Sequence, residues 1–184
     1  MTVHDFAAIA REIKASRAMC GDVHVIAIDG PAGSGKTTLA AGLVPELNNC
    51  PVIHLDDVYD GWLQDFDQEL GQRLRREVLE PLQQGAPGKY AKYNWYTKSF
   101  DSFVKVPKGD YLILEGVGSN NLVITELLAY SIWIEANADV LIDRIISRDG
   151  ESMRPHLAGF KRREADYFEK HNVKARADLQ LSGD

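Results

Sequence analysis

The 184 residues include 27 acidic and 21 basic side chains, giving a formal net charge of −6, and 45% of them are hydrophobic. This composition is typical of a single globular domain, and it excludes a strongly basic surface for nucleic acid. No apolar run is long enough to span a membrane, and residues 1–17 have no apolar signal core. We therefore expect a cytoplasmic protein with neither nucleic acid nor membrane as a partner.

The first elements of the chain predict a helix, a strand, a glycine-rich loop and a second helix. In residues 2–17, Phe6, Ile9 and Ile13 recur at helical spacing, which predicts an amphipathic helix that packs on a sheet. Residues 23–28 form an apolar run that is typical of a buried strand. The loop 30–37 reads GPAGSGKT, and a helix is expected to follow it. A strand, this loop and a helix in that order are the context of the Walker A phosphate-binding motif.

The residue types of the loop fit the chemistry of polyphosphate binding. Backbone N–H groups grip phosphate, so glycine is needed where the chain approaches it, and the positive end of the following helix faces the anion. We expect Lys36 to be catalytic at the β- and γ-phosphates and the Thr37 hydroxyl to ligate Mg²⁺. The other predicted nucleotide-binding residues here are Gly30, Ala32, Gly33, Ser34, Gly35 and Thr38. The motif predicts ATP and magnesium as cofactors.

Two carboxylates follow the second predicted strand, residues 51–55. Ligands bind beyond the carboxyl ends of parallel strands, so Asp56 and Asp57 are expected beside the phosphates. An extended backbone would point the two side chains in opposite directions. Asp56 is the candidate base for an acceptor hydroxyl and a candidate holder of a magnesium-bound water. A turn or helix-capping acid is the alternative interpretation.

Residues 61–106 are predicted to form an insertion outside the main sheet. A largely helical segment, bent or ended by Pro81, covers 61–84, and two short strands at 89–96 and 102–106 predict a hairpin. The aromatic residues of the hairpin could stack on a planar base or simply pack within the hairpin. These residues are Tyr93, Trp95 and Tyr96.

The second half of the chain alternates strands with helices. We expect strands at 111–116, 131–135 and 177–181, and helices at 122–130, 139–148 and 155–171. This alternation predicts one α/β domain, 1–184, with a parallel five-stranded sheet flanked by helices. Glu115 ends a core strand, as a Walker B acid that orients magnesium does. A lysine-paired strand-end acid is the alternative.

Three arginines follow the fourth core strand. Arg144 and Arg148 share a helical face, and with Arg154 they could close over a transferring phosphate and stabilise its charge. A solvated helix surface would look similar. The basic residues 161–163 are interpreted as a solvated face, and the five histidines show no metal-ligand spacing.

Five motifs, in this order and spacing, resemble the uridine kinase and phosphoribulokinase-like group of P-loop kinases over residues 23–154. The motifs are Ile28 to Thr37, Leu55-Asp56-Asp57-Val58-Tyr59, Tyr93-Asn94-Trp95, Leu114-Glu115-Gly116, and Arg144 to Asp149.

The resemblance implies that Asp56 activates the acceptor hydroxyl, that Tyr93 lies in the base-binding region and that Arg148 and Arg154 belong to a lid over ATP. Lys98 falls where uridine kinases typically have a histidine. The lid also has fewer arginines than is usual, so uridine specificity stays open. We assign Asp56, Tyr59, Tyr93, Lys98 and Glu115 to the substrate site.

The sequence therefore favours ATP-dependent phosphoryl transfer to a hydroxyl of a small metabolite, with a nucleoside as the preferred candidate. The insertion 61–106 is expected to bind the acceptor, and residues 144–160 to form a lid. The alternative is a P-loop ATPase or nucleotide-binding switch that acts on a protein partner. Self-association into a homo-oligomer is compatible with the sequence.

Overall fold

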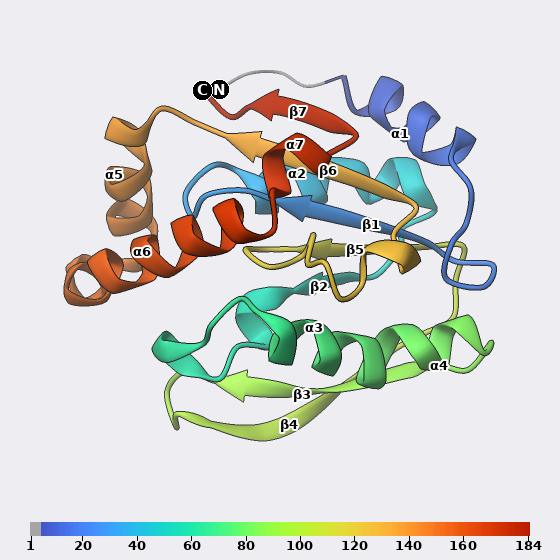
Figure 1. The fold of residues 1–184 in the computed structure, drawn as a ribbon, viewed down its shortest axis with the longest axis horizontal. Helices are drawn as coiled ribbons and strands as arrows, with labels where there is room; N and C mark the ends of the chain where they lie inside the picture. Colours follow the sequence, from blue (N-terminus) through green and yellow to red (C-terminus); the bar gives the residue numbers. More distant parts are fainter. Residues whose placement is uncertain (1–4) are drawn as a thin grey trace.

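The computed structural model describes residues 5–184, which form a parallel sheet in the order β2-β5-β1-β6-β7 and a separate two-stranded sheet, β3-β4 (Figure 1). The strands of the main sheet are β1 (His24–Asp29), β2 (Val52–His54), β5 (Tyr111–Glu115), β6 (Tyr130–Glu135) and β7 (Leu179–Ser182). The predicted five-stranded parallel sheet is confirmed. The phosphate loop follows its central strand, β1.

Two hydrophobic layers cover the two faces of the sheet, because successive side chains of a strand point to opposite faces. Ile26 and Ile113 pack with α1 (Phe6–Ala15) and α2 (Lys36–Leu43) on one face. Val25 and Leu112 pack with the insertion and with α6 on the other. Residues 2–4 of the first predicted helix lie outside the described residues.

The insertion contains three consecutive helical pieces and then the predicted hairpin. These elements are α3 (Gln68–Leu74), a π-helical stretch (Arg75–Leu79), α4 (Glu80–Gln83), β3 (Gly88–Asn94) and β4 (Ser99–Val106). Proline has no N–H, so Pro81 cannot donate a helical bond to Glu77. One residue earlier, the Glu80 N–H donates to the carbonyl of Arg75, five positions back. The helical pattern therefore changes next to the proline, but the helix does not end there, because α4 continues to Gln83.

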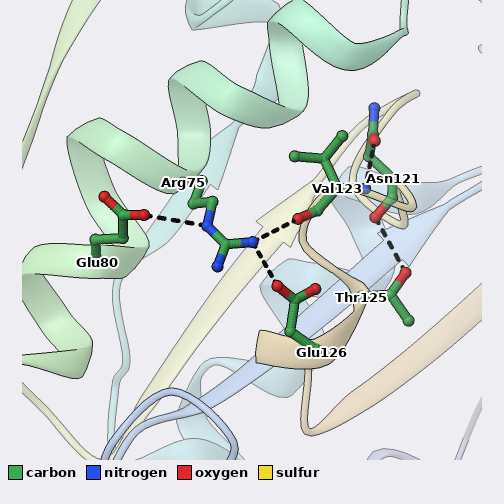
Figure 2. A network of polar contacts seen from close by, with 6 residues as sticks. All are labelled: Arg75, Glu80, Asn121, Val123, Thr125 and Glu126. Atoms are coloured by element: carbon green, nitrogen blue, oxygen red, sulfur yellow. Dashed lines mark hydrogen bonds and ion pairs between the residues drawn. The ribbon is translucent and has the colours of Figure 1, made fainter.

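Residues 122–130 were predicted to be a helix, and this prediction is wrong: only a 3₁₀ turn, Thr125–Leu127, forms before β6. Figure 2 shows the polar contacts that replace the helical bonds. The Arg75 guanidinium donates a hydrogen bond to the Val123 carbonyl at 3.0 Å and also contacts the Glu126 carboxylate. The Thr125 hydroxyl donates to the Asn121 carbonyl at 3.1 Å. Long-range contacts thus outweigh local helical propensity and attach the insertion to the loop after β5.

The remaining helices are α5 (Ala138–Asp149), α6 (Arg154–Lys170) and α7 (Val173–Arg176). Helix α5 and the start of α6 lie at the end of the sheet towards which β1, β6 and β7 point (Figure 1). The side chain of Asn137 caps α5 by accepting from the Asp139 N–H. In the part of the chain that the structure describes, no helix combines the length and the apolar character needed to cross a membrane.

Candidate active site

The phosphate loop curves between β1 and α2 in a conformation that its glycines make accessible. Gly30 has φ of 140°, and a Cβ there would lie 2.0 Å from the Ile134 carbonyl oxygen. Gly35 has φ of 104° and precedes the first turn of α2. A side chain at either position would clash or be strained. The backbone N–H groups at the start of α2 are thus presented as an anion site.

The side chain of Lys36 folds back onto the loop and contacts the loop's own backbone. Its ammonium donates to the carbonyls of Gly30, at 2.7 Å, and Pro31, at 2.9 Å. Burial lowers the pKa of Lys36, and the negative charges of Asp29 and Glu115 oppose that shift. The residue is only 8% exposed. A cation is thus held where the motif requires one for phosphate.

A cavity of about 1030 Å³ extends along the loop and gathers most of the predicted site residues. Its lining includes Lys36 and Thr37 from the loop, Asp56 after β2, and Glu115 at the end of β5. The predicted nucleotide contacts Ala32, Gly33, Gly35, Thr38, Arg144 and Arg148 also line it. Residues from four separate parts of the sequence therefore face one volume.

Glu115 is the central acid of this cavity and is 6% exposed. It accepts a hydrogen bond from the Thr37 hydroxyl at 3.1 Å, and it contacts the His54 Nδ1 atom. The hydrogen bond to Glu115 raises the pKa of His54. The sequence did not single out His54, although its place at the end of β2, two residues before Asp56, was visible. No lysine pair is recorded for Glu115 among the described side chains, in contrast to the alternative interpretation.

Asp56 lines the cavity from a 3₁₀ turn, Leu55–Asp57, rather than from the extended backbone that was expected. The Trp95 indole N–H donates to the Asp56 carbonyl at 2.9 Å and ties this turn to the hairpin. Burial in the cavity, and then the Glu115 charge, raise the pKa of Asp56. Asp57 turns to Lys92, with a separation of 3.0 Å between the charged atoms. The two neighbouring acids therefore have different surroundings, although the backbone that joins them is not extended.

The oxygen donors around Thr37 suit magnesium. Mg²⁺ prefers hard oxygen ligands and is commonly held by one or two carboxylates together with substrate phosphates and water. Thr37 and Glu115 are hydrogen-bonded to each other, and Asp56 faces the same cavity. Within residues 5–184, no group of three or more His, Cys, Asp and Glu side chains could hold a metal alone. The set fits a metal that arrives with a phosphate ligand.

The three predicted arginines are not equivalent. Arg144 and Arg148 line the cavity, and Arg148 makes two bonds to its neighbour Asp149, at 2.7 and 2.6 Å. Arg154 is paired with Glu151 at 2.8 Å, and among the described residues it is not part of the cavity lining. The structure therefore brings two of the three arginines to the loop.

The predicted acceptor residues outside the strand ends are not part of the cavity lining that the described residues form. Tyr59 is buried in the core and donates to the Val117 carbonyl at 2.7 Å. Tyr93 is buried in the hairpin, with ring centroids 5.2 Å from both Trp95 and Phe100. Lys98 lies exposed in the hairpin turn, with φ of 54°. Tyr59 and Tyr93 thus pack inside the protein, and Lys98 lies on its surface.

Helix α6 holds the phosphate loop from outside, and this contact corrects the interpretation of 161–163 as a solvated face. Glu164 accepts from the Ala32 N–H at 3.0 Å, while Lys161 donates to the Ala32 carbonyl at 3.1 Å. Arg163 contacts the Trp62 carbonyl of the insertion. Only Arg162 is exposed. The Lys161–Glu164 spacing of one helical turn was a signal that the sequence offered.

A second contact joins α6 to the start of the loop through Asp29. This buried carboxylate accepts from the N–H groups of Gly30, at 2.8 Å, and Asn120, at 2.9 Å, and from the Tyr167 hydroxyl at 2.8 Å. Burial raises the pKa of Asp29. The side chain is satisfied on both oxygens, so it fixes the loop instead of facing a ligand.

Comparison with known proteins agrees with this geometry. The family model described as AAA domain matches residues 26–169. A possible uridine kinase from Bacillus stearothermophilus has a TM-score of 0.66 at 21% identity, covering 96% of this chain and 97% of that one. A candidate fructose transport system kinase from Silicibacter sp. TM1040 has a TM-score of 0.58 at 20% identity, covering 97% and 99%. The curated proteins include no match. The expected likeness to uridine kinase-like P-loop kinases is confirmed at the level of the fold.

Proposed function

We propose that this chain, which belongs to the AAA domain family, transfers the γ-phosphoryl group of ATP to a hydroxyl of a small metabolite. One observation carries the proposal: a single cavity contains both the phosphate loop and, at the adjacent strand ends, the carboxylates Asp56 and Glu115. An alcohol acceptor needs a base beside its hydroxyl and a cationic surround for the phosphate. Both requirements have candidates in this cavity.

The roles follow from the positions. The loop and Lys36 bind the β- and γ-phosphates. Asp56 accepts the proton of the acceptor hydroxyl, and the oxygen of that hydroxyl bonds to the γ-phosphorus. The bond from the γ-phosphorus to the β–γ bridging oxygen breaks at the same time, which releases ADP. Thr37, Glu115 and Asp56 would hold Mg²⁺, which neutralises charge on the phosphates when bound. Arg148 adds positive charge over the transferring group.

Within this function, we assign the acceptor to the insertion 61–106 and the lid to 144–160. The favoured acceptor is a nucleoside, because aromatic rings gather beside Asp56 and can stack on a planar base. The Trp62 and Trp95 centroids are 5.0 Å apart, and Phe160 of α6 lines the cavity. Closure of the insertion over the acceptor would exclude water and limit hydrolysis of ATP.

Free cysteines favour a cytoplasmic setting for this activity. Cys20 and Cys50 are both buried and unbridged. Unpaired thiols are typical of a reducing compartment.

The test is ADP production by the whole chain with Mg²⁺ and ATP, alone and with a panel of nucleosides and sugars. We expect at least one compound that contains a hydroxyl to raise ADP production well above the basal rate and to yield a phosphorylated product. If no acceptor does so while ATP is still hydrolysed, the kinase proposal fails and an ATPase or switch that acts on a protein is favoured.

A further inference from the structure

Beyond the phosphate loop, the residues that line the cavity include two groups, which we call its two arms. One arm reaches Asp56 and Glu115, at the carboxyl ends of β2 and β5. The other follows the side of α2 through Thr38 and Gly42 to Phe6, in the first turn of α1. Under the proposed function the γ-phosphate faces Asp56. The nucleoside of the donor, at the opposite end of the triphosphate, therefore extends into the second arm.

Phe6 makes a direct contact with the backbone of α2 in that second arm. A Cβ on Gly42 would lie 2.3 Å from the ring atom Cζ of Phe6 and 2.4 Å from Cε1. Because Gly42 has no side chain, the Phe6 ring can contact the backbone of α2. Phe6 also continues the apolar face of α1, but it is only half-buried, whereas Ile9 and Ile13 are fully buried in the core. Its ring serves both the core and the cavity.

We infer that Phe6 forms the platform on which the base of the donor nucleotide stacks, an inference that rests on the proposed function. A base has an apolar, planar face, and stacking on an aromatic ring is favourable whichever base is present. The phosphate loop supplies N–H groups and cations for the phosphates, but this arm of the cavity needs a flat apolar surface. Helix α1, which precedes the phosphate-binding strand in the chain, provides it.

The C-terminal end of the chain completes the surroundings of the loop. A Cβ on Gly183 would lie 2.0 Å from the Ser34 carbonyl oxygen, so the backbone after β7 rests directly against the loop. Arg144 donates to the Gly183 carbonyl at 3.0 Å, and both residues line the cavity. Leu181 of β7 packs on the same hydrophobic cluster as Phe6. The first helix and the last strand are therefore both part of the donor site.

The inference can be tested by calorimetric binding of Mg-ATP and of Mg-tripolyphosphate, which has the phosphates without the base. We expect Phe6→Ala to weaken Mg-ATP binding about 2- to 12-fold, as lost aromatic stacking implies, and to leave Mg-tripolyphosphate binding unchanged. Phe6→Leu keeps the apolar packing of α1 on α2, so this variant is expected to fold normally. It should also lose affinity for Mg-ATP and not for Mg-tripolyphosphate. Phe103→Ala, the same change at an exposed position on β4, serves as the matched control and should bind both ligands as the unmodified protein does.

The outcomes separate the inference from the function on which it rests. Unchanged Mg-ATP affinity in both Phe6 variants overturns the stacking platform while the kinase proposal stands. Equal weakening of both ligands also overturns it, because the ring would then act only by supporting the loop. If the unmodified protein binds neither ligand, the proposed function itself fails.

Discussion

The end of the cavity that we propose for the donor is built mainly from one continuous stretch, whereas the end proposed for the acceptor is assembled from distant segments. Residues 30–37 follow one another between β1 and α2 and contain the phosphate loop with its lysine and hydroxyl. The proposed acceptor end combines Asp56 after β2 and Phe160 from α6, which line the cavity, with two tryptophans of the insertion behind them: Trp62 contacts Phe160, and Trp95 bonds to the Asp56 carbonyl. Phosphate is bound by backbone geometry that a short motif encodes. Recognition of an acceptor depends on side chains that only folding brings together.

Helix α6 is what the two ends have in common. Its Glu164 and Lys161 contact Ala32 of the loop, and its Phe160 and His156 lie against Trp62 of the insertion. The His156 and Trp62 rings are stacked with centroids 4.6 Å apart. One rigid element therefore touches both sides. Substitutions that separate donor binding from transfer are the way to test whether the two ends act independently.

The largest effect is expected at the donor end, from Lys36→Ala. Loss of the lysine that we propose for the β- and γ-phosphates should lower kcat by at least about 10² to 10³, since its charge is not replaced. Steady-state ADP production measures this, with the exposed Lys108→Ala as a charge-matched control that retains activity. Normal turnover in Lys36→Ala would reject the assignment of the motif.

Asp56→Asn should separate phosphoryl transfer from ATP binding. The amide preserves shape but cannot take the proton of the hydroxyl, so kcat should fall by about 10² to 10⁴ while Mg-ATP affinity stays within about threefold. Calorimetry and a product assay together measure both quantities. Asp57→Asn, which removes the ion pair with Lys92 and leaves the Asp56 carboxylate in place, is the neighbouring control and should lose far less activity than Asp56→Asn. Weak ATP binding with intact transfer would show that Asp56 serves only the metal or the fold and is not the base.

Trp95→Phe should give the smallest effect, confined to the acceptor end. It keeps an aromatic ring but removes the indole N–H that bonds to the Asp56 carbonyl. A hydrogen bond of this kind contributes about 0.5–1.5 kcal/mol. We therefore expect kcat/KM for the acceptor to fall about 2- to 12-fold with an unchanged KM for ATP. Tyr96→Phe is the control, because Tyr96 is 96% exposed. Equal losses for both substrates would show that the hairpin supports the whole cavity.

Local patterns predicted the elements of the main sheet well and the contacts between them poorly. Apolar runs at 23–28, 111–116 and 131–135 became β1, β5 and β6, because strands buried on both faces need continuous apolar sequence. The segment 122–130 had a helical pattern but lost its helix to the contacts of Arg75, 48 residues away from Val123. No spacing rule could indicate that competition.

The site residues likewise fall into those that local patterns identified and those that only the structure revealed. Lys36, Thr37, Asp56 and Glu115 were identified from motif spacing and strand ends, and they do face one cavity. His54, Phe6 and the Lys161–Glu164 pair were not identified as site residues, since each depends on a partner that is far away in the sequence. The roles of Tyr59, Lys98 and Arg154 in substrate or nucleotide binding stay predictions that this arrangement does not support.

By itself, the sequence determined the phosphate loop, the parallel α/β sheet and the two acids at the strand ends. These depend on hydrophobic period, on glycine's backbone freedom and on the rule that parallel strands end at one edge, all of which act over a few residues or one sheet. Only the tertiary structure decided that α6 holds Ala32, that Phe6 reaches the cavity across Gly42 and that Gly183 rests on the loop. Contacts of that kind arise from close packing of whole elements, whose relative positions no local pattern contains.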